Sequence, residues 1–426
     1  MSEYDKKWLY SSLSPRPNIR KISSLTDEDI ETRLILDKKE ALIMSTAEEK
    51  NEEIGLFRDM VLRFIEQEVL PHYDQWEKDH IMPREMWNTM GDAGMLLVDF
   101  PEKYGAAEAS FDVCQMIQEE MSRLGLHGLA TGYNIHANIV APYVLNIGNE
   151  EQKDLWLPKM ATGEVVGAIA MTEPGAGSDL AGMRSSAIKD GDEYILNGSK
   201  TFITNGIHAD MVIVCAKTDP AAGSKGISLF LVDTSLPGYS TGAKIEKMGQ
   251  HSSDTAELFF DNVRLPANAL LGEEGKGFVY LMKELPRERL GCAVQAIGHA
   301  QGALDLTAEY VQERKAFGQS IGQFQNTRFK LAECKTELEM CRALLEKHMG
   351  KYERGEMTID DAAMLKLSST EMQLRMVNEC LQLFGGYGYT DEYPISRFYR
   401  DARIQTIYAG TSEIMKEVIA RGIVGR

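Results

Sequence analysis

The sequence predicts an α+β fold in which helices and strands occupy separate blocks of the chain. Over residues 46–165, apolar side chains recur every three or four positions, which is the spacing of amphipathic helices. Residues 166–275 are rich in Val, Ile, Phe and Thr between turn residues, which favours strands, and the helical spacing returns over 276–426. Because the blocks do not alternate as strand-helix-strand units, we expect an N-terminal helical domain, a central antiparallel β domain and a C-terminal helical domain. Residues 1–45 are polar and are expected to form an extension, whose role the sequence does not give.

Both helical blocks contain clear amphipathic patterns. In the last block, residues 291–317 and 324–355 each carry the pattern of one long helix, and the charged segment Glu284–Leu290 is expected to open the first of them. In the first block, Pro71 is expected to end the opening helix. The apolar positions of that opening helix are Leu56, Phe57, Met60, Val61, Phe64, Ile65 and Val69.

The central block contains five segments that are typical of strands. Asp190-Gly191-Asp192 and Leu196-Asn197-Gly198 resemble the tight turns that join antiparallel strands, so we expect a hairpin at each. The five expected strands cover residues 165–173, 194–203, 211–218, 226–234 and 255–265.

Charge and cysteine content exclude several classes of function. A formal net charge of −18 argues against a basic surface for nucleic acid. The six cysteines form no C-x-x-C pair and no His cluster has metal-ligand spacing, so we expect reduced, mostly buried thiols and no metal site. No apolar run approaches the roughly 20 residues of a membrane-spanning helix. The first residues lack the apolar core of a signal peptide, and we therefore expect a cytoplasmic protein.

Two glycine-rich segments resemble phosphate-binding motifs but lack their defining residues. Gly272–Gly277 has no Ser or Thr after its lysine and does not have the glycine spacing of a Walker loop. Gly175-Ala176-Gly177 has Leu180 where a dinucleotide fingerprint needs its third glycine, and it lies in a β context. A Rossmann-type site is therefore not expected.

Two segments of the central block have the residues needed to hold a flat, polar-edged ring. Met171–Asp179 combines small residues, which let backbone amides approach a ligand closely, with the hydroxyls of Thr172 and Ser178. In Thr201–Gly206, Phe202 and Thr204 alternate and therefore face the same side of a strand. An ordinary turn and an ordinary core phenylalanine remain alternative readings of these two segments.

The C-terminal block adds three further candidate segments. Phe384–Tyr389 is a glycine-rich turn that follows Gln382, and it also fits a simple helix end. Arg314–Gly318 places cations at the end of a long helix, where they either favour the helix dipole or hold a pyrophosphate. Glu288 by itself resembles any charged residue in a first helical turn.

Taken together and in order, these segments resemble the acyl-CoA dehydrogenase family from about residue 50 to residue 426. The resemblance implies an N-terminal helical domain, a central β domain and a C-terminal four-helix bundle. It also implies FAD as cofactor, an acyl-CoA substrate in fatty acid β-oxidation, a homotetramer, and electron transfer to an electron-transferring flavoprotein. Five motifs carry it: AMTEPGAGSDL at 170–180, NGSKTFITNG at 197–206, ERKAFGQ at 313–319, LFGGYGY at 383–389 and IYAGTSEI at 407–414.

The resemblance also assigns roles to individual residues of this chain. Phe202 stands where many members have tryptophan against the flavin, and Thr204 would lie near flavin N5. The substrate positions match Ser178, Arg289 and Gly410, of which Ser178 and Arg289 would touch the CoA part. Arg314, Phe317 and Gln325 match residues that reach FAD from a neighbouring subunit. The remaining positions that match flavin contacts are Met171, Thr172, Gly177, Ser178, Ile203, Gln382, Leu383, Gly386, Thr411 and Glu413.

One departure from the family pattern points to a branch of the family. Medium- and short-chain members carry their catalytic glutamate directly before Gly-Thr-Ser, where this chain has Ala409. Long-chain and isovaleryl members place the base on another helix in a Glu-Arg-Leu context, which here is Glu288-Arg289-Leu290. The resemblance is therefore strongest to the long-chain enzymes and implies Glu288 as the catalytic base.

The implied reaction is α,β-dehydrogenation of an acyl-CoA to the trans-2-enoyl-CoA. Glu288 would remove the α-proton while flavin N5 accepts the β-hydride, and burial should raise the pKa of Glu288 toward neutral pH. A backbone amide at Ala409 or Gly410 would polarise the thioester carbonyl. Two alternatives stay open, namely an acyl-CoA oxidase-like flavoenzyme that uses oxygen and a non-catalytic scaffold that binds flavin or acyl-CoA.

Overall fold

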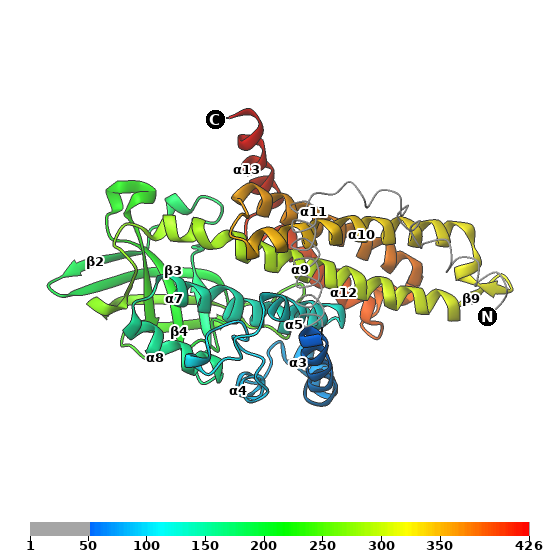
Figure 1. The fold of residues 1–426 in the computed structure, drawn as a ribbon, viewed down its shortest axis with the longest axis horizontal. Coiled ribbons are helices and arrows are strands. Elements are labelled where there is room, and N and C mark those ends of the chain that lie inside the picture. Colours follow the sequence, from blue (N-terminus) through cyan, green and yellow to red (C-terminus); the bar gives the residue numbers. More distant parts are fainter. Residues whose placement is uncertain (1–51, 426) are drawn as a thin grey trace, which may run out of the picture. The chain divides into compact units, whose positions relative to one another are not determined.

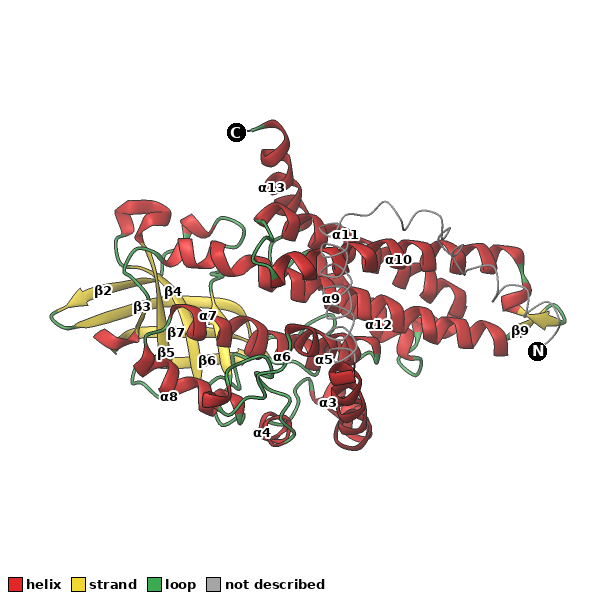
Figure 2. Cartoon of the chain, in the orientation of Figure 1, coloured by secondary structure: helices red, strands yellow, loops and turns green. Residues whose placement is uncertain are grey.

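The predicted α+β fold with two helical regions around a central β region is confirmed. The computed structural model describes residues 52–425, and its helices and strands from residue 56 onward belong to the compact unit Leu56–Arg426. Figure 1 follows the chain through helices, a sheet and long helices. Figure 2 shows the strands of the sheet gathered at the left, while the short strand Lys315–Ala316 lies at the right, at the end of the long helices. The expected extension over residues 1–45 lies outside the described residues.

The prediction that Pro71 ends the first helix is wrong. Helical residues continue through a π-helical turn, η2 (Ile65–Val69), directly into α3 (Leu70–Asp79). Pro71 lies in the first turn of α3, where its missing N–H costs no helical hydrogen bond. The helix ends instead at His80, which has a left-handed backbone with φ 58°.

The remaining N-terminal helices lead to the sheet. Phe111–Arg123 forms α5, and the almost fully buried run 127–147 consists of α6 (His127–Tyr133), η4 (Asn134–Val140) and α7 (Ala141–Ile147). Shorter elements are α4 (Glu85–Asp92), η3 (Glu102–Tyr104) and α8 (Glu150–Ala161).

The central sheet has eight strands. Seven follow one another in the order β6-β7-β3-β2-β4-β5-β8, and the eighth, β1, pairs with β4. Its pairing corrects the expectation of a purely antiparallel domain, because β1 runs parallel to β4 and β2 meets β4 in parallel at one residue pair. All other pairings on the path are antiparallel. The strands are β1 (Gly167–Ala170), β2 (Ser186–Asp190), β3 (Glu193–Thr204), β4 (Met211–Lys217), β5 (Ile227–Asp233), β6 (Tyr239–Lys244), β7 (Thr255–Pro266) and β8 (Leu270–Leu271).

One of the two predicted hairpins forms and the other does not. Asp190 pairs with Glu193 across a two-residue turn, as expected. Leu196-Asn197-Gly198 instead lies inside β3, where the register against β7 shifts between Leu196 and Gly198. The Asn-Gly pair therefore makes a bulge, and Gly198 is needed there because a Cβ would lie 2.3 Å from Ser185 Oγ.

Long helices form the C-terminal region, and Figure 1 shows α9, α10 and α11 side by side. They pack through a shared core that includes Leu290, Ile297, Leu338 and Leu365. The elements are α9 (Gly277–Glu313), β9 (Lys315–Ala316), β10 (Gln319–Ser320), α10 (Gln325–Glu353), α11 (Ile359–Phe384), η9 (Gly385–Tyr389), α12 (Pro394–Ala402) and α13 (Ser412–Val424).

The expectation that Glu284–Leu290 opens a helix is wrong, because α9 begins at Gly277 and carries Pro286 in its interior. Glu288 consequently lies deep within a 37-residue helix rather than in an exposed first turn. The residues around Glu288 are buried because α9 packs against α5, α10 and α11.

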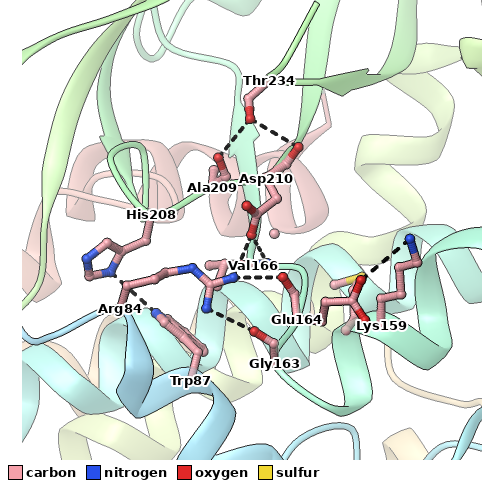
Figure 3. Close-up of polar contacts among 12 residues, drawn as sticks. Arg84, Trp87, Lys159, Gly163, Glu164, Val166, His208, Ala209, Asp210 and Thr234 are labelled. Carbon is pink, nitrogen blue, oxygen red and sulfur yellow. Dashed lines mark hydrogen bonds and ion pairs between the residues drawn. The ribbon is translucent and has the colours of Figure 1, made fainter.

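A polar cluster around Arg84 joins the N-terminal helices to the sheet (Figure 3). Arg84 donates hydrogen bonds to the carbonyls of Gly163 and Glu164 and pairs with Asp210 at 2.7 Å. Asp210, directly before β4, also accepts from the backbone N–H of Val166 at 2.9 Å. The cluster therefore connects Arg84 to the segment between α8 and β1 and to the residue directly before β4.

Candidate functional site

Glu288 lies in the interior of the protein, where α9 meets α7. Its side chain is 4 % exposed, and the hydroxyl of Tyr143 donates to Glu288 Oε1 at 2.8 Å. Burial raises the pKa of Glu288 to about 7, against the opposing effects of the Tyr143 hydrogen bond and the positive charge of Arg289. A carboxyl with this pKa can accept a proton near neutral pH, as the sequence-based hypothesis requires.

Arg289 and the loop at Gly410 lie together beside Glu288. A Cβ placed on Gly410 would lie 3.7 Å from Arg289 Nη2, so the guanidinium approaches this loop closely. Arg289 is buried, and within residues 52–425 its Nε and Nη1 have no hydrogen-bond partner. A buried cation with two unused donors is suited to binding a polar or anionic group.

The Ala409–Gly410 loop is held in an unusual backbone conformation. Both residues have positive φ, 51° for Ala409 and 92° for Gly410, and strain of this kind for a non-glycine residue is often found at functional sites. The buried amine of Lys366 donates to the Gly410 carbonyl at 2.7 Å. Burial lowers the pKa of Lys366 to about 8. The loop that lacks a glutamate at position 409 is therefore anchored by Lys366 beside the side chain of Arg289, which follows the alternative glutamate in the chain.

The two predicted ring-binding segments of the sheet lie side by side. Thr201 N donates to the Thr172 carbonyl at 2.9 Å, and the buried Lys200 amine donates to the Met171 carbonyl at 3.1 Å and to Glu173 at 2.9 Å. The segment after β1 and the end of β3 therefore form one surface, onto which Met171, Thr172, Phe202 and Thr204 gather.

The residues of this surface fit a flavin. Phe202 is 66 % exposed and has φ 59°, so an aromatic ring is presented to the outside in a conformation that is costly for a bulky residue. Ile203 is buried beneath it, while Gly177 and Ser178 are exposed and a Cβ on Gly177 would meet nothing within 4 Å. An open aromatic face with hydroxyls nearby is the environment that a flat, polar-edged heterocycle needs.

A second set of candidate residues lines a hollow of about 470 Å³ near the far end of α9. Arg314 lies at its rim with its guanidinium 5.3 Å from the ring centre of Tyr387. The structure thus brings together four of the predicted residues, namely Arg314, Gln382, Leu383 and Gly386.

Phe317 and Gln325 flank this hollow along the chain without lining it. Phe317 is 95 % exposed at the tip of the β9–β10 hairpin, where φ is 52°, and Gln325 begins α10. An exposed phenylalanine at a hairpin tip leaves most of its apolar surface available to another molecule.

The two sets of candidate residues are far apart within one chain. Glu288 and Arg314 are separated along α9 by a helical rise of roughly 40 Å. This distance exceeds the length of one flavin adenine dinucleotide. Thr411, which caps α13, and Glu413 follow Gly410 directly and belong with the Glu288 set.

Sequence reasoning did not identify Tyr143, Lys200 or Lys366. A signal existed for Lys366, because it interrupts the buried face of an amphipathic helix, where a lysine needs a specific partner. Tyr143 carries no such signal, since its partner Glu288 is 145 positions away.

Two negative expectations can be compared with the described residues. Between residues 52 and 425, no group of His, Cys, Asp and Glu is arranged to hold a metal ion. Over the same residues, no helix is long and apolar enough to cross a membrane. All six cysteines lie in this range, and each is buried and free, as predicted.

The fold and the site define the class of protein: a flavoenzyme built to act on acyl thioesters. Three family models match the chain consecutively: the acyl-CoA dehydrogenase N-terminal domain over 51–164, the middle domain over 168–263 and the C-terminal domain over 275–424. The chain belongs to the acyl-CoA dehydrogenase family, whose members are FAD-dependent oxidoreductases.

Individual members of the family are similar to this chain over most of its length. The long-chain specific acyl-CoA dehydrogenase of Mus musculus is 47% identical over 374 residues, covering 87% of this chain and 86% of the relative. An isovaleryl-CoA dehydrogenase of Pongo abelii is 40% identical over 376 residues, covering 87% and 88%. The crystal structure of an acyl-CoA dehydrogenase from Geobacillus kaustophilus matches with a TM-score of 0.85 and 47% identity, covering 88% of this chain and 98% of that one.

Proposed function

We propose that this chain dehydrogenates long-chain acyl-CoA thioesters to trans-2-enoyl-CoA products, with Glu288 as the catalytic base. The observation that carries the proposal is the buried Glu288 carboxyl, which is hydrogen-bonded to Tyr143, in a chain that has alanine at position 409 in place of the usual base. The 47% identity to a long-chain specific enzyme favours long acyl chains over the branched substrate named for the 40% identical relative.

The residues of the chain have separate tasks in this reaction. Glu288 takes the α-proton, so that the α C–H bond breaks, an O–H bond forms on the carboxyl and the electron pair becomes part of the new double bond. Bound FAD supplies the acceptor for the hydride that leaves the β-carbon. A backbone amide of the Ala409–Gly410 loop polarises the thioester carbonyl, and Ser178 and Arg289 bind the CoA part.

The flavin-binding residues fall into two groups that serve different copies of the chain. We assign the sheet surface around Phe202 to the flavin of its own chain and the group at the far end of α9 to the cofactor of a neighbouring copy. This arrangement extends the sequence-based assignment, since Gln382, Leu383 and Gly386 lie with Arg314 in one hollow. A shared site requires an oligomer, for which the family resemblance suggests a homotetramer. An electron-transferring flavoprotein as the electron acceptor and a cytoplasmic location are further proposals that rest on the sequence.

The test is an anaerobic titration of the purified flavoprotein with palmitoyl-CoA, with Glu288→Gln as the variant. We expect the flavin absorbance of the unmodified protein to bleach, and bleaching in the variant to be slowed by at least about 100-fold, because an amide cannot accept the α-proton.

Other outcomes distinguish the alternatives. Unchanged bleaching in Glu288→Gln would assign the base to another carboxylate. Bleaching only with shorter or branched acyl-CoAs would contradict the long-chain assignment. No bleaching with any of these thioesters would favour a binding scaffold, whereas rapid reoxidation of the reduced flavin in air would favour an oxidase-like enzyme.

A further inference from the structure

Helix α7 presents two hydrogen-bond donors to two carboxyls of α9. Tyr143 donates to Glu288 Oε1 at 2.8 Å. Asn146 donates to both oxygens of Glu284 at 3.2 and 3.1 Å. The donors are three positions apart on one helix and the acceptors four apart on the other, so each pair shares a helix face.

The chemistry of Tyr143 suits a permanent donor. Its side chain is fully buried, and burial together with the negative charge of Glu288 raises the pKa of its hydroxyl well above the usual value. The hydroxyl therefore keeps its proton throughout the pH range in which Glu288 titrates.

The hydrogen bond also distinguishes the two oxygens of Glu288. Tyr143 occupies Oε1, and within residues 52–425 no hydrogen bond reaches Oε2. The oxygen without a partner is the one that remains available to a substrate proton. A carboxyl held through one oxygen is restricted in rotation, which keeps the other oxygen directed at a fixed place.

We propose that Tyr143 is a positioning residue for the reaction: its hydroxyl holds Glu288 through Oε1, stabilises the carboxylate and leaves Oε2 to accept the α-proton. The inference rests on the proposed function, in which Glu288 is the base. It adds a residue that acts through the base and does not itself touch the substrate.

Other charged and titratable groups around Glu288 also affect its pKa, and the effect of Tyr143 adds to theirs. Arg289 stabilises the carboxylate, whereas the negative charge of Glu284 destabilises it. Cys215 of β4 and Cys292 of α9 also face Glu288, and burial raises the pKa of both thiols, which keeps them neutral. Replacing Tyr143 by phenylalanine removes a donor and leaves the nearby charges in place, so the pKa of Glu288 should rise.

The first measurement uses Tyr143→Phe and needs no turnover. The carboxyl stretching band of Glu288 is followed by infrared titration of the holoprotein and is assigned by its loss in Glu288→Gln. We expect its midpoint, about 7 in the unmodified protein, to rise by about one pH unit in Tyr143→Phe.

Tyr133→Phe is the matched control. Tyr133 is also fully buried, and its hydroxyl donates to the Met95 carbonyl at 3.0 Å instead of to a carboxyl. This variant loses a buried tyrosine hydroxyl and its hydrogen bond without touching Glu288. Its infrared midpoint should match that of the unmodified protein, which separates positioning of the base from a general loss of packing.

The second measurement is the pH dependence of flavin bleaching by acyl-CoA. A midpoint raised by one unit lowers the rate for Tyr143→Phe about eightfold more at pH 6 than at pH 9. Loss of the hold on Glu288 lowers the rate at both pH values, so a loss remains at pH 9, where the carboxyl is ionised in both proteins. An unchanged infrared midpoint, or a rate loss that is equal at both pH values, would overturn the proposal. Absence of bleaching in the unmodified protein would count against the proposed function alone, because the infrared midpoint decides the role of Tyr143 independently.

Discussion

At the scale of single residues, burial is what would make Glu288 a useful base in the proposed reaction. A solvent-exposed glutamate is ionised at neutral pH but holds a proton too weakly to compete for a thioester α-proton. Burial against α7 and within α9 penalises the carboxylate and raises its pKa to about 7, while Tyr143 and Arg289 prevent a larger rise. The residue is thus a stronger base than an exposed glutamate and remains ionised often enough to act.

The same pKa shift makes the stability of the protein depend on pH. The pKa of Glu288 rises from 4.5 to about 7 on folding, so between these values the unfolded carboxyl loses its proton while the folded one keeps it. The contribution of this group is therefore fully present below pH 4.5 and is lost as the pH rises through 7, on the order of 3 kcal/mol in total.

Urea unfolding of the holoprotein at pH 5 and pH 8 tests this expectation. Glu288→Gln has no such titration, so its stability relative to the unmodified protein should increase between the two pH values. Exchange of the exposed Glu66 for glutamine is the control for the loss of a surface carboxyl. A pH-independent effect of Glu288→Gln would show that the carboxyl does not titrate in this range.

The sequence predicted Glu288 but not the contacts that tune it. Two local features sufficed for the glutamate, namely the missing carboxyl at Ala409 and the Glu-Arg-Leu context. Tyr143 and Lys366 act through contacts with residues 145 and 44 positions away, and no local spacing encodes such pairs. Packing alone determines which distant groups meet.

At the scale of elements, α9 and β3 provide the positions on which the site depends. The prediction that Glu284–Leu290 opens a helix is wrong, because tertiary packing holds α9 together across Pro286, a residue that is usually found in the first turn of a helix. The Asn-Gly pair in β3 was misread as a turn, because its local preference also fits a bulge. Long periodic segments were predicted well, whereas the short strands β2, β6 and β8 were missed because their patterns are brief and partly exposed.

The Arg84 cluster determines how the N-terminal helices meet the sheet, so its loss should weaken the fold. Arg84→Gln leaves the carbonyls of Gly163 and Glu164 without their donor and removes the ion pair to the partly exposed Asp210. We expect a loss of about 1–2 kcal/mol in the free energy of unfolding, measured in urea.

Lys159→Gln is the comparison for this prediction. Lys159 pairs with Glu164 at 3.6 Å in the same region, but both side chains are largely exposed, and we expect almost no change in stability. Equal effects of the two variants would mean that Arg84 contributes only surface charge.

At the scale of the whole molecule, the length of α9 separates two sets of flavin-binding candidates. One set consists of Glu288, Arg289 and the Gly410 loop. The other set lines the hollow and includes Arg314 and Gln382. Under the proposed function, a complete site would need two copies of the chain, each lending its far end of α9 to the other. The family membership was predictable from five motifs, but the grouping of Gln382, Leu383 and Gly386 with Arg314 required the fold.

Mixing two inactive variants tests whether sites are shared between copies. One chain carries Glu288→Gln with an intact hollow, and the other carries Arg314→Ala and Gln382→Ala with an intact Glu288. Alone, the first variant should bind flavin, but acyl-CoA should not reduce that flavin. The second variant alone should bind flavin weakly, because the cofactor in each copy loses the Arg314 cation and the Gln382 amide of its neighbour. In co-expressed mixed oligomers, the intact hollow of the first chain serves the Glu288 site of the second, so activity should reappear at one site in each mixed pair. Activity that stays absent in mixed oligomers, with their composition verified by mass spectrometry, would show that each chain holds its flavin without its neighbour.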